Sequence, residues 1–207
     1  MTQVLTPTTT PQTGSAPSFG AHLADPGPLG LAGFALTTFM LSSFNSGLAP
    51  KSAEVVVLGV ALFYGGIAQL GAGMWEFAKG NTFGALAFSS YGAFWMAFWY
   101  LVSNGKNLPT TGTDAAQGIG VFLLAWTIFT LYMTIVASRI SGFLFSLFAI
   151  LLVTFAFLTL GEFGGSSAMT HIGGYLGLVT AMVAWYGSFA GVYNASVKRV
   201  VMPTWPR

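Results

Sequence analysis

The chain has 207 residues, of which 54% are hydrophobic and only 6% are charged. Soluble domains contain roughly a quarter charged residues, so this composition indicates a membrane protein. Seven Lys and Arg residues against five Asp and Glu residues give a net charge of +2. These few charges are too sparse for a surface that binds nucleic acid. The sequence has no cysteine, which excludes disulfides, thiolate metal ligands and a cysteine nucleophile.

The N-terminal region, residues 1–24, is rich in Thr, Pro and Ser and contains no Lys or Arg. This composition is typical of a disordered tail. It lacks the positively charged start of a secretory signal peptide. We therefore expect a disordered tail over residues 1–24, a transmembrane domain over residues 25–199 and a short C-terminal tail over residues 200–207.

Six apolar stretches follow the tail, and each has the length of about 20 residues that a helix needs to cross a bilayer. The nine prolines all lie outside these stretches, where they interrupt no helix. The sequence therefore predicts an all-α integral membrane protein with six transmembrane helices, over residues 29–49, 54–75, 82–103, 116–138, 142–161 and 169–197.

The distribution of positive charges predicts the orientation. Six crossings place both termini on the same side of the membrane. Five positive residues lie on that side and two on the other: Lys79, Arg139, Lys198, Arg199 and Arg207 against Lys51 and Lys106. Because cytoplasmic loops carry the excess of Lys and Arg, we expect a multi-pass protein of the plasma or inner membrane with cytoplasmic termini.

The second and third stretches contain the most distinctive pattern. Glycines 59, 66 and 73 recur every seven residues and share one helix face. Eight of the twenty residues from 81 to 100 are aromatic. In lipid, small residues let helices approach closely. We expect Gly66 and Gly73 to serve helix packing, beside a narrow central passage lined by aromatic side chains.

Charged residues are absent from the interior of the six stretches. Buried ionisable residues mark proton relays in many membrane proteins, so the passage is expected to be neutral. Glu76, Glu162 and His171 lie at predicted helix ends, where each is a candidate pH-sensitive group; the alternative for His171 is an interfacial hydrogen-bonding residue. Glu76 and Lys79 are three residues apart and could pair across one helical turn, although an exposed pair of this kind contributes little stability.

Neutral polar side chains remain as candidates for contact with a solute, because they can hydrogen-bond a small carboxylate or its acid. Ser and Thr can instead bond the preceding turn of their own helix, and both readings stay open. The candidates are Thr37, Asn45, Tyr64, Gln69 and Ser90.

The sequence shows no recognisable set of residues for a metal site or a phosphate-binding loop, as many enzymes have. The two histidines, His22 and His171, have no carboxylates at the spacing of metal ligands. The Gly-rich segment 65–73 lacks the lysine and the preceding strand of a phosphate-binding loop. We expect no enzymatic activity, no metal and no cofactor.

Four motifs, FYGGIAQ, AGMWE, GNTFG and SSYGAFW, occur in this order between residues 63 and 95. They resemble the core signature of the acetate uptake transporter family, the acetate–succinate permeases of bacteria and their yeast relatives. Residues 25–31, DPGPLGL, are similar to the family's N-terminal signature Asn-Pro-Ala-Pro-Leu-Gly-Leu, with Asp25 and Gly27 as departures. The likeness extends from Asp25 to Ala195.

The resemblance implies a homo-hexamer whose protomers each have their own pore for acetate and similar short monocarboxylates, as a channel or with a coupled proton. It implies a hydrophobic constriction formed by Phe34, Tyr91 and Leu151. It also links Leu151 and Ala184 to the admission of succinate, and both residues stand here unchanged, which favours acetate. Asp25 adds a negative charge at the mouth of the pathway.

Two other functions stay open: a passive channel for a neutral solute such as urea or ammonia, and a scaffold whose glycine faces only build oligomers. A carboxylic acid with a pKa of about 4–5 is mostly anionic at neutral pH. The anion is costly to place in an uncharged passage. We therefore expect transfer of the neutral acid, or of the anion with a proton, and uptake that rises as external pH falls.

Overall fold

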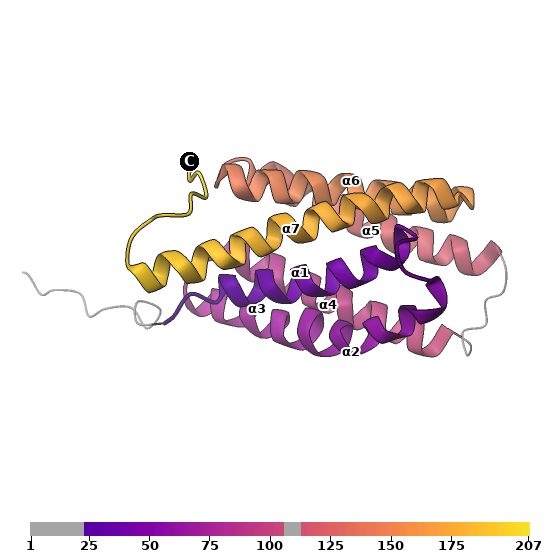
Figure 1. Ribbon diagram of the computed structural model, residues 1–207, viewed down its shortest axis with the longest axis horizontal. Helices are drawn as coiled ribbons and strands as arrows, with labels where there is room; N and C mark the ends of the chain where they lie inside the picture. The colour runs from indigo at the N-terminus through magenta and orange to yellow at the C-terminus, as the bar shows by residue number, and fades with distance from the viewer. Residues whose placement is uncertain (1–22, 106–112) are drawn as a thin grey trace, which may run out of the picture.

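Six long helices pack side by side in the computed structural model, which describes residues 23–105 and 113–207 (Figure 1). Each helix is long and apolar enough to cross a membrane, which confirms the predicted six-helix membrane fold. The expected disordered tail lies outside the described residues up to residue 22. The helices are α1 (Gly27–Asn45), a composite helix of η2 (Lys51–Val56), α2 (Val57–Leu62), η3 (Phe63–Ala68) and α3 (Gln69–Ala78), and then α4 (Thr82–Asn104), α5 (Thr113–Ala137), α6 (Gly142–Gly164) and α7 (Ser167–Val197).

Local sequence signals begin and end several of these helices. Asn81, Ser141 and Ser166 precede α4, α6 and α7, and each side-chain oxygen accepts a hydrogen bond from a backbone N–H of the first turn. Such a cap contributes about 1 kcal/mol. Gly165 ends α6 with φ 59°, a left-handed conformation that glycine adopts without steric penalty.

The turn between α3 and α4 is shorter than the sequence predicted, because α3 continues through Glu76 to Ala78. Glu76 is only 2% exposed, and its Oε2 accepts a hydrogen bond from Asn81 Nδ2 at 2.8 Å. Lys79 Nζ lies 3.8 Å from Asp25 Oδ1 instead. The Glu76–Lys79 pair that the residue spacing allows is therefore replaced by these two contacts, because spacing along α3 does not reveal that α1 and the start of α4 close over Glu76.

Glycines allow the backbones of neighbouring helices to meet. An ideal Cβ on Gly73 would lie 2.6 Å from Ser89 N in α4, and one on Gly92 would lie 2.8 Å from Leu70 N in α3. On the other side of the bundle, a Cβ on Gly174 of α7 would collide with the backbone at the end of α1. Helix packing within the protomer is thus the role of these glycines, as predicted for Gly73.

The composite second helix contains a π-helical turn, η3, which packs against α1. An ideal Cβ on Gly33 of α1 would lie 2.6 Å from the carbonyl oxygen of Tyr64. Gly65 and Gly66, inside the π turn, are buried. π-Helical turns inside α-helices are frequent at functional sites, and this one ends at Ala68, immediately before Gln69.

The last ten residues, 198–207, return to the turn between α5 and α6, and we call them the C-terminal strap. Gly142 N donates to Trp205 O at 2.8 Å, and Arg207 N donates to Ile140 O at 3.0 Å. Asn194 in α7 fixes the start of the strap with three hydrogen bonds, to Val201 N, Met202 N and Met202 O. The predicted short tail is therefore packed against the bundle.

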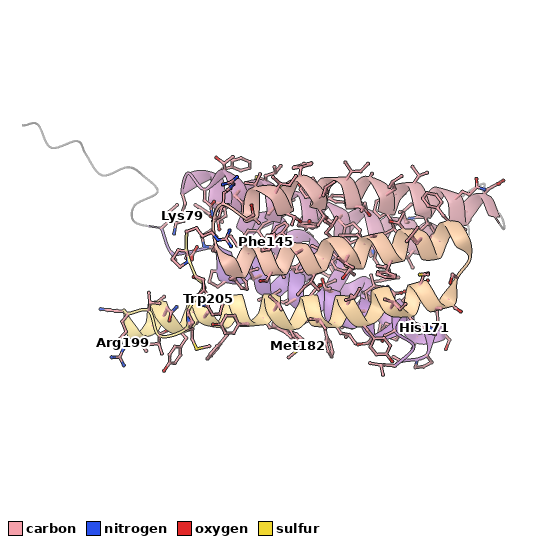
Figure 2. The ribbon with its side chains drawn as sticks, turned by 90° about the horizontal axis from the view of Figure 1, so that it is seen from above. Lys79, Phe145, His171, Met182, Arg199 and Trp205 are labelled. Atoms are coloured by element: carbon pink, nitrogen blue, oxygen red, sulfur yellow. The ribbon has the colours of Figure 1, made fainter. Side chains whose placement is uncertain are left out.

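The described ends of the chain lie at one end of the bundle. Figure 2 shows Lys79, Arg199 and Trp205 together there, and His171 at the opposite end. We name the two ends the Lys79 end and the His171 end. Between them the outward side chains are large and apolar, as Ile128 in α5 and Met182 in α7 illustrate, with exposed fractions of 57% and 58%. Such a belt suits contact with lipid or with other protomers.

The substitution Gly73→Ala tests the close α3–α4 contact. We expect it to destabilise the protein by roughly 1–3 kcal/mol, because the added methyl group overlaps the Ser89 backbone. Gly71→Ala is the matched control, since no atom lies within 4 Å of a Cβ at Gly71. Thermal unfolding of the purified protein measures both. Equal melting temperatures for the two variants would contradict this packing.

Candidate functional site

A cavity of about 180 Å³ lies at the Lys79 end between α1, α3, α4 and α6. Polar groups lie at its mouth, where Asp25, Glu76 and Asn81 contribute to its wall. Further in, the wall is mostly aromatic and aliphatic. One water molecule requires only about 10–15 Å³ of such space, so the cavity is large enough for a small organic solute.

Three residues implied by the family resemblance meet at the inner end of this cavity. Phe34 lies seven residues after the first residue of α1, Tyr91 ten residues after Asn81, and Leu151 seven residues after Leu144. At 1.5 Å per helical residue, all three lie about 10–15 Å from the mouth. The structure thus brings Phe34, Tyr91 and Leu151 to one depth, and their role as the narrowest point of a pathway stays a prediction.

These side chains are almost completely enclosed, with exposed fractions of 6% for Phe34, 3% for Tyr91 and 4% for Leu151. The Phe34 and Tyr91 ring centroids are 5.6 Å apart. Phe129 packs edge-on against the Tyr91 ring at 5.4 Å, and Phe148 lies 6.1 Å away. Such tilted and edge-on contacts are favourable for aromatic rings, and they hold the Tyr91 ring in place at the end of the cavity.

The Tyr91 hydroxyl is anchored outside the cavity wall, on α5. Tyr91 Oη lies 2.8 Å from Thr130 Oγ1, and Thr130 is fully buried. Thr130 Oγ1 also donates to the carbonyl oxygen of Trp126 at 2.7 Å. A carbonyl oxygen only accepts hydrogen bonds, so the single Thr130 hydroxyl proton is used there. The Tyr91 hydroxyl is consequently the donor in its bond to Thr130.

Gln69 is the polar group within the wall that has an unused hydrogen-bonding atom. It is 1% exposed, and its Oε1 atom has no hydrogen-bond partner. Buried polar atoms are normally paired. Gln69 lines the cavity, but Oε1 itself is enclosed, so a rotation of the side-chain amide is needed to bring this unpaired acceptor to a solute.

The two departures from the family signature are connected at the mouth. Gly27 N donates to Asp25 Oδ1 at 3.2 Å. An ideal Cβ on Gly27 would lie 3.3 Å from Asp25 Oδ1 and 3.5 Å from Glu76 Oε1. The alanine of the signature would therefore crowd the aspartate found here. The mouth holds two carboxylates, with Lys79 beside Asp25 and Asn81 bound to Glu76.

Three other polar candidates do not line this cavity. Thr37 is fully buried and donates to Gly33 O at 2.9 Å, one turn back in its own helix. Tyr64 and Ser90 are half-buried and are also outside the wall. Ala184 is fully buried and follows Thr180, which contacts Thr154 of α6. It therefore lies on the face of α7 that packs against α6 rather than in the cavity wall.

The remaining candidates lie at the His171 end. Asn45 and His171 line a second cavity of about 390 Å³ together with Lys51. Lys51 Nζ donates to Asn45 Oδ1 at 3.2 Å and pairs with Glu54. Glu162 is half-buried in the last turn of α6. Over residues 23–105 and 113–207, no three His, Asp or Glu side chains gather as a metal site.

Sequence reasoning missed Asn81, Phe148 and Thr130. Asn81 was detectable, because an asparagine before an apolar helix is a common cap, although its bond to Glu76 was not. Thr130 resembles any other threonine that bonds its preceding turn. Only the approach of α4 to α5 gives it a partner 39 residues away.

The fold and the cavity define a multi-pass membrane protein of six helices with a solute-sized cavity that is closed by apolar rings. Residues 7–206 match the GPR1/FUN34/yaaH family, and the chain belongs to this family. The resemblance drawn from the four sequence motifs is thereby confirmed.

Three similar proteins illustrate the family. The structure of the bacterial acetate channel SatP has a TM-score of 0.81 and 39% sequence identity, covering 88% of this chain and 99% of that one. The succinate-acetate/proton symporter SatP of Escherichia coli is 40% identical over 87% of this chain and 95% of its own. The ammonia transport outward protein 2 of Saccharomyces cerevisiae is 40% identical over 86% of this chain, which spans 65% of the yeast protein.

Asn81 permits a test that separates its two roles. Asn81→Asp keeps the oxygen that caps α4 but places a second carboxylate beside Glu76. We expect a loss of about 1–3 kcal/mol of stability at pH 8, because the charge-assisted hydrogen bond becomes a repulsion. This loss diminishes toward pH 5, since one carboxyl group then takes up a proton and the pair shares it.

Melting temperatures at both pH values measure this effect. Asn81→Ser is the matched control, because it retains a capping oxygen without a charge and is expected to lack the pH-dependent loss. If Asn81→Asp unfolds at the wild-type temperature at pH 8, the Glu76–Asn81 bond does not contribute to stability.

Proposed function

We propose that this protein transports acetate and similar short monocarboxylates across a membrane. The observation that carries the proposal is the cavity at the Lys79 end, whose wall includes Phe34, Tyr91 and Leu151 at its inner end, with no charged residue at that depth. A small, partly apolar solute matches such a wall. The names of the SatP relatives, an acetate channel and a succinate-acetate/proton symporter, support the same substrate class.

The chemical groups that line the cavity change from its mouth to its inner end. At the mouth, Lys79 is the nearby cation and Asn81 offers amide hydrogen bonds. Deeper in the wall, Gln69 supplies a hydrogen-bonding amide among apolar side chains. At the inner end, the ring of apolar groups excludes water and hydrated ions, since an apolar constriction dewets readily. The energetic barrier for a charged solute is therefore highest at the ring.

A second candidate function is the passage of a neutral solute such as ammonia. The name of the yeast relative, ammonia transport outward protein 2, favours it. An uncharged constriction admits a neutral solute as well as a neutral acid. Competition between solutes separates the two functions, because only a shared pathway lets acetate slow the flux of the other solute.

Uptake of labelled acetate into proteoliposomes is the test of the proposal. We expect flux above that of protein-free liposomes, inhibition by excess unlabelled acetate and little inhibition by urea. Flux of ammonia that acetate does not reduce would support the second function instead. No flux of any solute would leave the scaffold as the better description of the chain.

The pH dependence of acetate uptake follows from the uncharged ring. At a fixed total concentration of acetate, we expect uptake to rise as external pH falls from 8 toward 5, because the neutral fraction grows about tenfold per pH unit above the pKa of the acid. Flux that is constant over this range and carries net charge under voltage clamp would establish anion conduction.

The size of Leu151 and the tight packing of Ala184 are expected to exclude the larger succinate. Leu151→Ala and Ala184→Gly are predicted to raise succinate uptake relative to acetate uptake several-fold. The first removes volume at the ring, the second loosens the packing of α7 against α6, which carries Leu151, and neither adds a donor. Val153→Ala in α6, on an exposed face, is the matched control. Unchanged succinate uptake with normal acetate uptake would refute this size filter.

The assembly and the orientation belong to the same proposal. A homo-hexamer with one pore per protomer suits the apolar side chains that cover the outside of the described bundle. Native mass spectrometry of the purified protein tests the subunit number.

The orientation follows from the positive charges at one end of the bundle, Lys79, Arg139, Lys198 and Arg199. This grouping supports cytoplasmic termini in the plasma or inner membrane. Labelling of a cysteine introduced after Arg207 tests this orientation. Transport without chemical conversion of the solute makes the protein a transporter rather than an enzyme.

A further inference from the structure

The Tyr91–Thr130 hydrogen bond determines what the ring can offer to a solute. Phe34, Leu151 and Phe148 have no polar side-chain atoms. Tyr91 has one hydroxyl proton, and that proton is donated to Thr130 because the Thr130 proton is already donated to Trp126 O. The ring therefore presents no free N–H or O–H to the cavity.

We propose that Thr130 is a positioning residue that sets which protonation form of a carboxylic acid crosses the ring. By accepting the Tyr91 hydroxyl proton, it leaves the four ring side chains without a donor for a carboxylate anion. The solute then meets the amide of Gln69, which pairs completely with the neutral acid but not with the anion, so the neutral acid is the form that passes. This inference rests on the proposed transport of short carboxylic acids. It means that Thr130, a residue of α5 outside the cavity wall, helps to determine the selectivity of that transport.

The chemistry of Gln69 agrees with this assignment. A carboxylate anion only accepts hydrogen bonds and leaves the free Oε1 of Gln69 unpaired, whereas a neutral acid donates its O–H to Oε1 and accepts from the same amide. An unpaired buried acceptor costs about 1–3 kcal/mol. The buried Trp95 indole also lacks a partner for its N–H, but Trp95 is not among the residues that line the cavity.

The substitution Thr130→Val tests the inference, because valine has nearly the shape of threonine and lacks the oxygen that binds Tyr91. Without this anchor on α5, the Tyr91 side chain is free to turn its hydroxyl toward the cavity, where it supplies a donor at the ring and the anion becomes a transported form. The measurement is acetate uptake into proteoliposomes at pH 6 and pH 8, with the flux through protein-free liposomes subtracted. For the wild-type protein we expect the flux to fall about tenfold per pH unit, as the neutral acid does. For Thr130→Val we expect a fall of about threefold per unit or less.

Three variants distinguish this role from a general loosening of the bundle. Thr130→Ser retains the oxygen and is expected to keep the steep wild-type profile. Thr127→Val removes a hydroxyl from the same helix that bonds Leu123 O and Thr159 rather than Tyr91, and it is also expected to keep the steep profile. Adding Tyr91→Phe to Thr130→Val removes the freed hydroxyl, so the steep profile returns whatever the absolute rate.

The outcomes are separable. Wild-type and Thr130→Val profiles of equal steepness overturn the inference, and so does an equally flat profile for Thr127→Val. If Thr130→Val does not fold, Thr130→Ala takes its place, because it removes the same oxygen and adds no volume. Absence of acetate flux in the wild-type protein refutes the proposed function itself, whereas acetate flux with unchanged pH profiles refutes only the role of Thr130.

Discussion

Hydrocarbon offers no hydrogen bonds, and this constraint explains most of the polar contacts in the bundle. Buried threonines repeatedly donate to the carbonyl four residues earlier, as Thr37, Thr134 and Thr180 do. These bonds remove hydroxyl protons from the helix surfaces, which can then pack as if they were apolar. The helices approach closely where glycine replaces a larger residue, so packing and hydrogen bonding together leave few polar atoms free inside the protein.

In the wall of the cavity at the Lys79 end this satisfaction is incomplete at one atom. Gln69 retains a free acceptor in a wall that is otherwise apolar. Tyr91 closes the inner end of the same cavity, but its hydroxyl is bound to Thr130 on the outer side of the ring. A solute in this cavity would therefore meet one buried amide and a ring of side chains without free donors. Selectivity in such a passage depends on the hydrogen-bonding atoms of the solute as much as on its size.

The mouth of the cavity differs from its interior because charges are tolerated near the helix ends. Glu76 is buried there with Asn81 as its partner, and Asp25 lies between Gly27 N and Lys79. The C-terminal strap packs on the α5–α6 turn at this same end. Charged side chains at the mouth and the C-terminal strap are thus both found at the Lys79 end. The second cavity, at the His171 end, is lined by Asn45, Lys51 and His171 among others.

The sequence determined the number, the approximate bounds and the membrane character of the six helices, because hydropathy and proline positions are local properties of the chain. It also indicated Phe34, Tyr91, Leu151 and Gln69 as candidate residues, through motifs and through their polarity in apolar stretches. It did not determine which neutral polar residues face a cavity, since that depends on the rotation of each helix against its neighbours. Thr37 and Gln69 are both neutral polar residues within apolar stretches of the sequence. In the structure, Thr37 donates a hydrogen bond to its own helix, whereas Gln69 lines the cavity.

Only the tertiary structure decided the partners of residues that are distant along the chain. The burial of Glu76 requires α1 and the start of α4 to close over it, which gives Glu76 a partner in Asn81 instead of Lys79. The strap requires Asn194 and the α5–α6 turn to meet. The partner of the Tyr91 hydroxyl is a threonine 39 residues later, because a hydroxyl proton goes to whichever acceptor the packed helices bring within reach.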